Sequence, residues 1–208
     1  MSKADRAYEA LRYRLIMLDI PPGEAINEVL LTAELGLGRT PIREALKRLE
    51  NDHLVVSFPR RGTFATNVDI KDLAMISEIR TVLEPLVARK AARTRGGSLR
   101  AGYEETIAAI QQLHPLRDQR KLLEFDLEVH RLIYFSTDNR HLTDTLIRLD
   151  DLATRIWCVV RDRIPDISGH LREHIDLLQS ILDGDEDRAA ALAGEHVRHF
   201  DESVRAVL

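Results

Sequence analysis

Apolar residues recur at helical spacing through almost the whole chain, and β-prone sequence is confined to residues 54–67. Within that stretch, two short runs rich in Val, Phe and Thr flank the sequence PRRG, which predicts a β-hairpin. Aromatic residues make up only 5% of the chain, which disfavours an all-β sandwich and suits packed helices. The sequence therefore predicts a mainly α protein with one β-hairpin.

The hairpin follows three predicted helices in the N-terminal region. Apolar spacing predicts helices over residues 4–18 and 28–35, and the sequence IPPGE ends the first of them. In the third, RTPIREALKRL (39–49), we expect Thr40 to cap the helix and Pro41 to occupy the first helical position. Three helices followed by a hairpin indicate a winged helix-turn-helix domain.

The third predicted helix has one apolar and one basic face. Its apolar residues follow helical spacing: Ile42, Ala45, Leu46 and Leu49. Arg43 and Lys47, four residues apart, share the opposite face. Residues 39–61 hold six basic and three acidic residues, although the net charge of the whole chain is −4. A local basic stripe of this kind can bind phosphate even in an acidic protein.

We interpret the basic face as a DNA-binding surface. The second helix of a helix-turn-helix places its N-terminal residues in the major groove, where Arg suits guanine and Thr suits phosphate. The candidate contacts are Arg39, Thr40, Arg43 and Lys47 of the helix and Arg60, Arg61 and Gly62 of the hairpin tip. A solvated helix that is basic on one side is the alternative, and the neighbouring short helix and basic hairpin tip argue against it.

Helical periodicity continues without interruption by strands from residue 70 to the end. The expected helices lie near residues 70–94, 98–113, 118–136, 141–163, 166–183 and 185–207. Breaks are expected at Gly96–Gly97, His114–Pro115, Thr137–Asn139, Pro165 and Gly184, and Asp69 is expected to cap the first helix. We therefore predict a winged helix-turn-helix domain over residues 1–68 and an all-α bundle over residues 69–208.

Four residues of the predicted bundle carry side chains suited to a metal ion. They are Asp126 and His130, four apart on one helix, and His174 and His196 on the apolar stripes of two later helices. Three imidazoles and one carboxylate can hold Zn²⁺, Ni²⁺, Mn²⁺, Co²⁺ or Fe²⁺. A lone buried histidine more often bonds a backbone carbonyl. His170 and His199 lie one helical turn from two of the candidates, so periodicity leaves them as alternative ligands.

The N-terminal sequence PPGEAINEVLLTAELGLGRTPIREALKRLENDHLVVSFPRRGTFATNV resembles the winged helix-turn-helix of GntR-family regulators, in the FadR-type branch. The similarity covers nearly all of residues 10–68, and RTPIREAL followed by PRRG is specific. The resemblance implies DNA contacts by Arg39, Thr40, Arg43 and Gly62. Gly38 stands where the family usually has Ser or Thr, and Val29 where some members have a DNA-contacting Arg. DNA affinity or sequence preference is therefore expected to differ from the family norm.

Three later blocks, FDLEVHRLI, REHIDLLQSI and GEHVRHF, resemble the FCD ligand-binding domain in its short, six-helix version. This resemblance implies that the metal ligands are Asp126, His130, His174 and His196. The block ISEIRTVLEPLVARKAA resembles the start of that domain, which implies that Arg80 meets the carboxylate of an effector. The alternative for Arg80 is an ion pair with Glu84 or Glu78. Asn139 matches a frequent Asn of the family and is the second candidate for effector binding.

Taken together, these features predict a ligand-responsive transcriptional repressor that binds a short palindromic operator in double-stranded DNA as a homodimer. Its second domain would bind a divalent metal ion and a small organic acid. The alternatives are a metal-dependent enzyme and a constitutive DNA-binding protein with a metal-free dimerisation module. We expect no enzyme, since no phosphate loop or nucleophile motif occurs. One cysteine, no signal sequence and no apolar run of about 18 residues predict a cytoplasmic protein with no membrane span.

Overall fold

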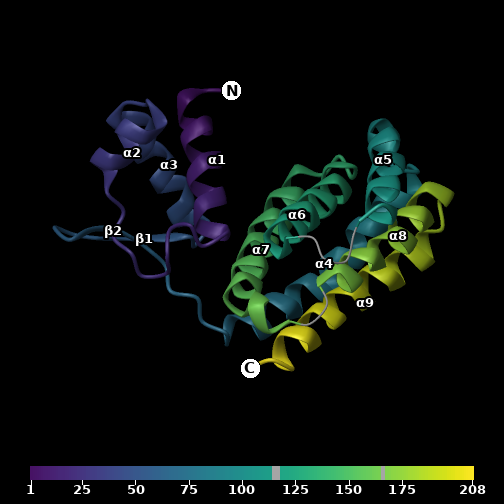
Figure 1. Cartoon of the computed structure of the whole chain (residues 1–208). Coiled ribbons are helices and arrows are strands. Elements are labelled where there is room, and N and C mark those ends of the chain that lie inside the picture. The colour runs from purple at the N-terminus through teal and green to yellow at the C-terminus, as the bar shows by residue number, and fades with distance from the viewer. Residues whose placement is uncertain (114–117, 165–166) are drawn as a thin grey trace. The chain divides into compact units, whose positions relative to one another are not determined.

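The computed structural model describes residues 1–113, 118–164 and 167–208, and the chain divides into two compact units, Met1–Asp69 and Ile70–Leu208. Both units are visible in Figure 1. The expected breaks at His114–Pro115 and Pro165 lie outside the described residues. The mainly α class is confirmed: helices dominate, and the described strands form one two-stranded antiparallel sheet.

The N-terminal unit has the expected order of elements. These are α1 (Lys3–Ile16), α2 (Glu28–Leu35), α3 (Arg39–Asn51), β1 (Val55–Phe58) and β2 (Gly62–Ala65). Side-chain caps explain where the first two helices begin, because Ser2 forms a capping box with Asp5 and the Asn27 side chain accepts the Leu30 backbone N–H. Gly36 ends α2 with a φ of 62°, a conformation that glycine adopts at little cost.

The expected cap of α3 is wrong. Helix α3 already begins at Arg39, and its N-cap residue is Gly38, which has no side chain to cap with. Thr40 and Pro41 therefore lie inside the first turn. Pro41 costs no hydrogen bond there, because the first N–H groups of a helix have no acceptor within the helix. The first turn of α3 thus leaves its N–H groups free of any side-chain cap.

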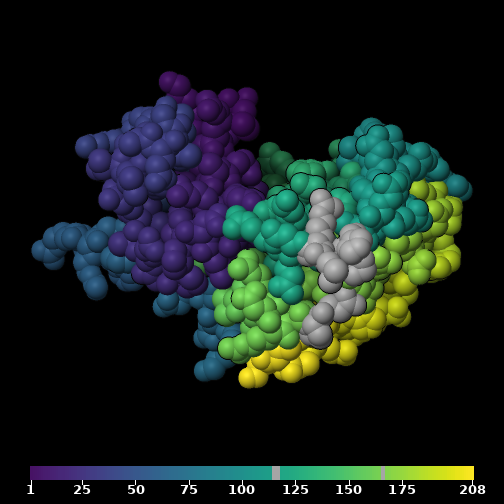
Figure 2. Space-filling view, viewed as in Figure 1, coloured from purple at the N-terminus to yellow at the C-terminus, as the bar shows by residue number. Residues whose placement is uncertain are grey.

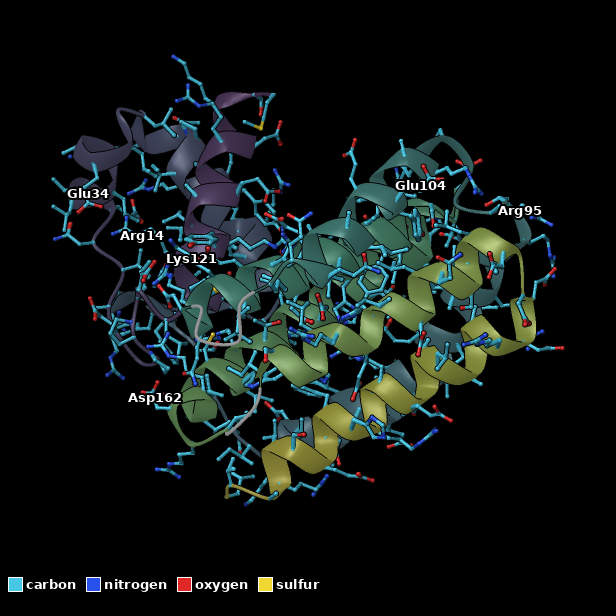
Figure 3. All side chains as sticks on the ribbon, turned by 45° about the vertical axis from the view of Figure 1, so that its right-hand side comes forward. Arg14, Glu34, Arg95, Glu104, Lys121 and Asp162 are labelled. Atoms are coloured by element: carbon cyan, nitrogen blue, oxygen red, sulfur yellow. The ribbon has the colours of Figure 1, made fainter. Side chains whose placement is uncertain are left out.

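Packing of α3 against α1 makes the core of this unit. The apolar face of α3 is buried as predicted, and it meets the equally buried Ala7, Leu11 and Leu15 of α1. An ion pair of 2.7 Å between Arg14 and Glu34, both labelled in Figure 3, joins α1 to α2. The basic face of α3 consequently stays exposed.

In its described residues, the second unit is a bundle of six longer helices. They are α4 (Asp72–Arg93), α5 (Arg100–Gln111), α6 (Gln119–Phe135), α7 (Arg140–Val160), α8 (Ile167–Asp183) and α9 (Glu186–Arg205), with short 3₁₀ turns η1 (Gly97–Leu99) and η2 (Arg161–Arg163). Asp69 is not the cap of the first helix, since α4 begins at Asp72 and follows Lys71. The other boundaries lie within a few residues of those expected.

Helix α4 is the central element of the bundle, because it packs against α6, α7, α8 and α9. In the space-filling view, side chains fill the spaces between the ribbons of this unit (Figure 2). Large buried residues such as Trp157, Tyr103 and Leu178 form its apolar interior. Across the described residues, every helix is too short or too polar to span a bilayer.

Candidate functional site

The bundle brings all four predicted metal ligands together. Helix α6 supplies Asp126 and His130, α8 supplies His174, and α9 supplies His196. One ligand atom from each of the four lies within 4.8 Å of the others. All four residues are at most 5% exposed. We call them the inner cluster.

The hydrogen bonds that reach outside the inner cluster engage the same ring nitrogen, Nδ1, in each of the three histidines. His174 Nδ1 donates to the Leu171 carbonyl over 3.2 Å, and His196 Nδ1 donates to the Glu173 carboxylate over 3.0 Å. The Tyr134 hydroxyl donates its proton to Glu84, so over 3.2 Å it accepts from His130 Nδ1. In His174 and His196, whose pKa values are lowered by burial, these bonds fix the tautomer in which Nε2 carries the lone pair.

The free nitrogens fit a cation between them. Within the described part of the chain, His174 Nε2 and Asp126 Oδ1 are buried without a hydrogen-bond partner. His130 Nε2 and His196 Nε2 face each other over 3.3 Å. Two nitrogen lone pairs at this distance repel unless a proton or a metal ion lies between them. The inner cluster therefore has the donor set of a divalent metal site.

Charge around the inner cluster also favours a cation. Three carboxylates, those of Glu84, Asp126 and Asp150, are almost fully buried beside one buried guanidinium, that of Arg80. With the histidines neutral, the carboxylates exceed the guanidinium by two negative charges, which one divalent ion would balance. Leaving it uncompensated in a low-dielectric interior is costly.

The pKa values follow this balance. Burial raises the pKa of Asp126 to about 6 and lowers the pKa of His174 to about 3. Burial also disfavours charge on His130, but the nearby Asp150 and Glu84 outweigh it and raise its pKa to about 9. The carboxylates thus favour positive charge at the position of His130, which a metal ion would supply in place of a proton.

Arg80 forms the predicted alternative contact, the ion pair with Glu84. Its Nε and Nη2 donate to one Glu84 carboxylate oxygen over 3.0 and 2.9 Å, and Nη2 lies 3.2 Å from Asp150. Arg80 still lines a small cavity of about 10 Å³ together with residues of the inner cluster. The Asn139 side chain instead caps α7 by accepting the Leu142 backbone N–H, and it is not among the described residues that line this cavity.

Sequence reasoning missed Asp150 and Tyr134. Asp150 lies at a buried position of α7 between Leu146 and Trp157 in helical spacing, so a charged residue on an apolar stripe was the available signal. Tyr134 follows His130 by one turn of α6, and its hydroxyl joins His130 to Glu84.

The candidate DNA-binding residues form an exposed surface on the N-terminal unit. Arg39, Thr40, Arg43 and Lys47 are all exposed along α3. Arg43 Nε lies 2.7 Å from Glu28 of α2, which orients the guanidinium. The register pairs Phe58 with Gly62, so Arg60 and Arg61 form the exposed hairpin tip. Gly62 has a φ of 95°, which explains why glycine occupies this position.

Comparison with known families and proteins agrees with this architecture. Residues 3–65 match the family described as bacterial regulatory proteins, gntR family, and residues 75–199 match the FCD domain. The uncharacterized HTH-type transcriptional regulator YdhC of Bacillus subtilis (strain 168) is 30% identical, over 97% of this chain and 90% of its own length. The HTH-type transcriptional repressor RspR of Escherichia coli (strain K12) is 24% identical, over 96% and 88%. The solved structure of E. coli McbR/YncC has the same fold, with a TM-score of 0.86 at 19% identity over 99% of this chain and 98% of that one.

Replacing Arg80 tests the charge balance of the buried site. Arg80→Met keeps the volume but leaves Glu84 and Asp150 without their cation, so we expect a loss of about 3–5 kcal/mol in the free energy of unfolding. The matched control is Arg140→Met, whose exposed side chain lies 3.9 Å from Asp144 and should contribute little. Urea denaturation of both variants measures the difference, and equal losses would show that Arg80 does not compensate the charge of Glu84 and Asp150.

Proposed function

Because the chain belongs to the GntR family of bacterial regulatory proteins and carries an FCD domain, it is a transcriptional regulator, and we propose that it acts as a metal-dependent, ligand-responsive repressor. Its relatives are regulators of transcription rather than enzymes, which sets the enzyme alternative aside. The observation that carries the proposal is the inner cluster, whose histidine nitrogens and carboxylate converge inside the FCD domain and include a buried His174 Nε2 and Asp126 Oδ1 without partners among the described residues. The repressor assignment follows from relatives such as RspR.

DNA binding would place α3 in the major groove of a palindromic operator. Its uncapped first turn offers backbone N–H groups to phosphate, and Arg39 and Arg43 lie at the same end. Glu28 occupies Arg43 Nε and leaves both Nη groups to donate to guanine or phosphate. Further contacts to the DNA phosphate backbone, on both sides of the groove, would come from Lys47 and from Arg60, Arg61 and Gly62 of the hairpin tip.

Two arginines of α3 separate this role from a general effect of charge. We expect Arg43→Ala to weaken DNA binding by about 1–3 kcal/mol, because it removes a groove contact. Arg48→Ala is the control, since Arg48 lies on the same helix but pairs with Asp5 over 2.8 Å and covers the Tyr8 ring. A DNA duplex that binds the wild-type protein is first selected from a random library. Fluorescence anisotropy with this duplex then measures the DNA affinity of both variants. Equal weakening by the two variants would exclude α3 as the specific contact surface.

The inner cluster would hold Zn²⁺, Ni²⁺, Mn²⁺, Co²⁺ or Fe²⁺. A bound ion would act as a Lewis acid that binds a carboxylate oxygen of a small organic acid. We propose Arg80 as the group that receives the far end of that effector, with Asn139 as a second candidate. Arg80 is already held by Glu84 and Asp150, so a carboxylate must replace one of these partners. The cavity of about 10 Å³ has room for one water-sized species, so effector binding would have to enlarge it.

Metal content tests the inner cluster directly. Elemental mass spectrometry of the untagged protein should find about one divalent ion per chain, and His174→Ala should lose it because His174 supplies one of four ligands. His141→Ala is the matched control, as His141 is an exposed histidine of the same unit. Small carboxylic acids should then raise the unfolding temperature of the loaded wild type and not that of His174→Ala. Wild-type protein that stays free of metal after reloading would refute the metal site.

The homodimer would form along α4, whose outer face carries an unpaired apolar stripe. Its members are Met75, Ile79, Val82 and Leu86, between 41% and 68% exposed. They recur at i, i+4, i+7 and i+11, the spacing of a coiled-coil seam. The N-terminal end of α4 carries the acidic Asp72 and Glu78, whereas the C-terminal end carries Lys90 and Arg93. This charge asymmetry favours an antiparallel pairing with α4 of a second copy.

Disulfide trapping tests both the partner and its direction. Antiparallel pairing of the stripe with itself has its centre between Arg80 and Thr81 and sets Met75 opposite Leu86 of the second copy. In a Cys158→Ser background, the double variant Met75→Cys/Leu86→Cys should therefore form disulfide-linked dimers, whereas Met75→Cys alone should not. In a parallel dimer, Met75 would lie opposite Met75 of the second copy, so Met75→Cys alone would form the disulfide.

Val82→Glu should convert the dimer to a monomer, because it buries a charge in the seam. Phe135→Glu, which changes an exposed apolar residue at the end of α6, is the control. Light scattering after gel filtration measures the mass of both variants. A dimer that survives Val82→Glu would place the interface elsewhere.

A further inference from the structure

A second group of metal-binding side chains adjoins the inner cluster on its more exposed side. The carboxylate of Glu173 on α8 lies among three histidine Nδ1 atoms. Its Oε2 is 3.0 Å from His196 and 3.8 Å from His170, and its Oε1 is 2.9 Å from His199. Only His196 of these residues belongs to the inner cluster.

His170 points to a ligand at this place. It is 7% exposed, and among the described residues its Nδ1 has no hydrogen-bond partner. The ring is held in place by stacking on His196, with centroids 3.9 Å apart, and by the edge of Trp157 at 4.5 Å. A fixed, buried and unsatisfied nitrogen beside a carboxylate is costly unless it has another partner.

One ligand atom from each of His170, Glu173 and His196 lies within 4.8 Å of the others. Two ligands of one Zn²⁺-like ion stand up to about 4 Å apart, since each metal–ligand bond is roughly 2.0–2.2 Å long. Side-chain movements of roughly an ångström, in which the stacked rings of His170 and His196 turn apart, would therefore bring the three donors onto one ion.

We propose that His170, Glu173 and Nδ1 of His196 form an outer metal site through which a divalent ion reaches the inner cluster. The inference rests on the proposed inner metal site. The inner ligands are almost completely buried, so an ion needs an access route. Side-chain exposure falls along this route from 52% at His199 to 35% at Glu173 and 3% at His196.

His196 joins the two sites because its two ring nitrogens face opposite ways. Nδ1 faces Glu173, and Nε2 faces His130 over 3.3 Å. A neutral imidazole has one lone pair, so it serves one ion at a time. An ion at the outer site uses Nδ1 while the ring proton resides on Nε2. If the ion moved inward to Nε2, the proton on that nitrogen would be released to water, and Nδ1 would take up another proton and restore the hydrogen bond to Glu173. This bond stabilises the inner position, so one ion per chain is retained at equilibrium.

The rate of metal uptake tests the outer site separately from the inner one. The metal-free full-length protein is mixed with Co²⁺ in a stopped-flow instrument, and the absorbance of protein-bound Co²⁺ is followed. His170→Phe keeps an aromatic ring between His196 and Trp157 but removes the donor. We expect uptake about 10–100-fold slower than in the wild type. The final content by elemental mass spectrometry should stay the same.

Two further variants complete the design. Glu173→Gln removes the anionic oxygen at similar volume and should also slow uptake, which keeps the test decisive if His170→Phe misfolds. His141→Phe, at an exposed histidine of the same unit, should load at the wild-type rate.

Wild-type rates in both site variants would overturn the outer site and leave the inner cluster standing. A lower final content at an unchanged rate in His170→Phe would make His170 an inner ligand and overturn the outer site as well. Failure of the wild type to take up Co²⁺ would remove the inner site, and both proposals with it.

Discussion

Burial of like charge is the constraint on which the helical unit depends. Glu84, Asp126 and Asp150 are all almost inaccessible to solvent, and one guanidinium, that of Arg80, lies among them. An unpaired buried carboxylate costs several kcal/mol, so the interior is stable only when further positive charge enters it. The carboxylates raise the pKa of His130 for this reason, while burial keeps His174 neutral. A neutral ligand nitrogen therefore lies beside a position that favours a cation, which is the electrostatic requirement of a metal site.

Helix α4 connects this charge cluster to the surface of the bundle. Its buried face supplies Arg80 and Glu84, and its outer face carries Ile79, Val82 and Leu86. Because a helix moves as a rigid element, a change in the pairing of Arg80 that shifts α4 would also shift Ile79 and Val82 on its opposite face. A dimer seam at that face would give a bound ion or effector a direct mechanical link to the partner subunit. Coupling of this kind acts in both directions, so the partner would influence ion binding equally.

Helical periodicity was sufficient to predict the elements of the bundle, and it narrowed the metal ligands to a few candidates from which the family resemblance selected the inner cluster. It works there because Asp126, His130, His174 and His196 all interrupt apolar stripes, where a polar side chain needs a buried partner. The partners themselves were harder to predict. Asp150 of α7 pairs with Arg80 of α4. Glu173 of α8 accepts a hydrogen bond from Nδ1 of His196 on α9 and so keeps the ring proton on that nitrogen. Such pairings depend on how helices dock, which local spacing does not encode.

The start of α3 shows the same limit at the level of a single turn. Thr40 has the chemistry of a cap, yet the chain turns into the helix at Gly38, with a φ of −73° and a ψ of 170°. The departure from the Ser or Thr usual in the family therefore has a structural consequence, since the backbone N–H groups remain uncovered. Val29 is a second departure from the family. It leaves α2 with an exposed valine where some members have a DNA-contacting arginine, so α2 lacks that positive charge. Its neighbour Glu28 is an anion that holds Arg43. In the proposed DNA-binding mode, positive charge would come from α3 and the hairpin tip, and α2 would position Arg43 through Glu28.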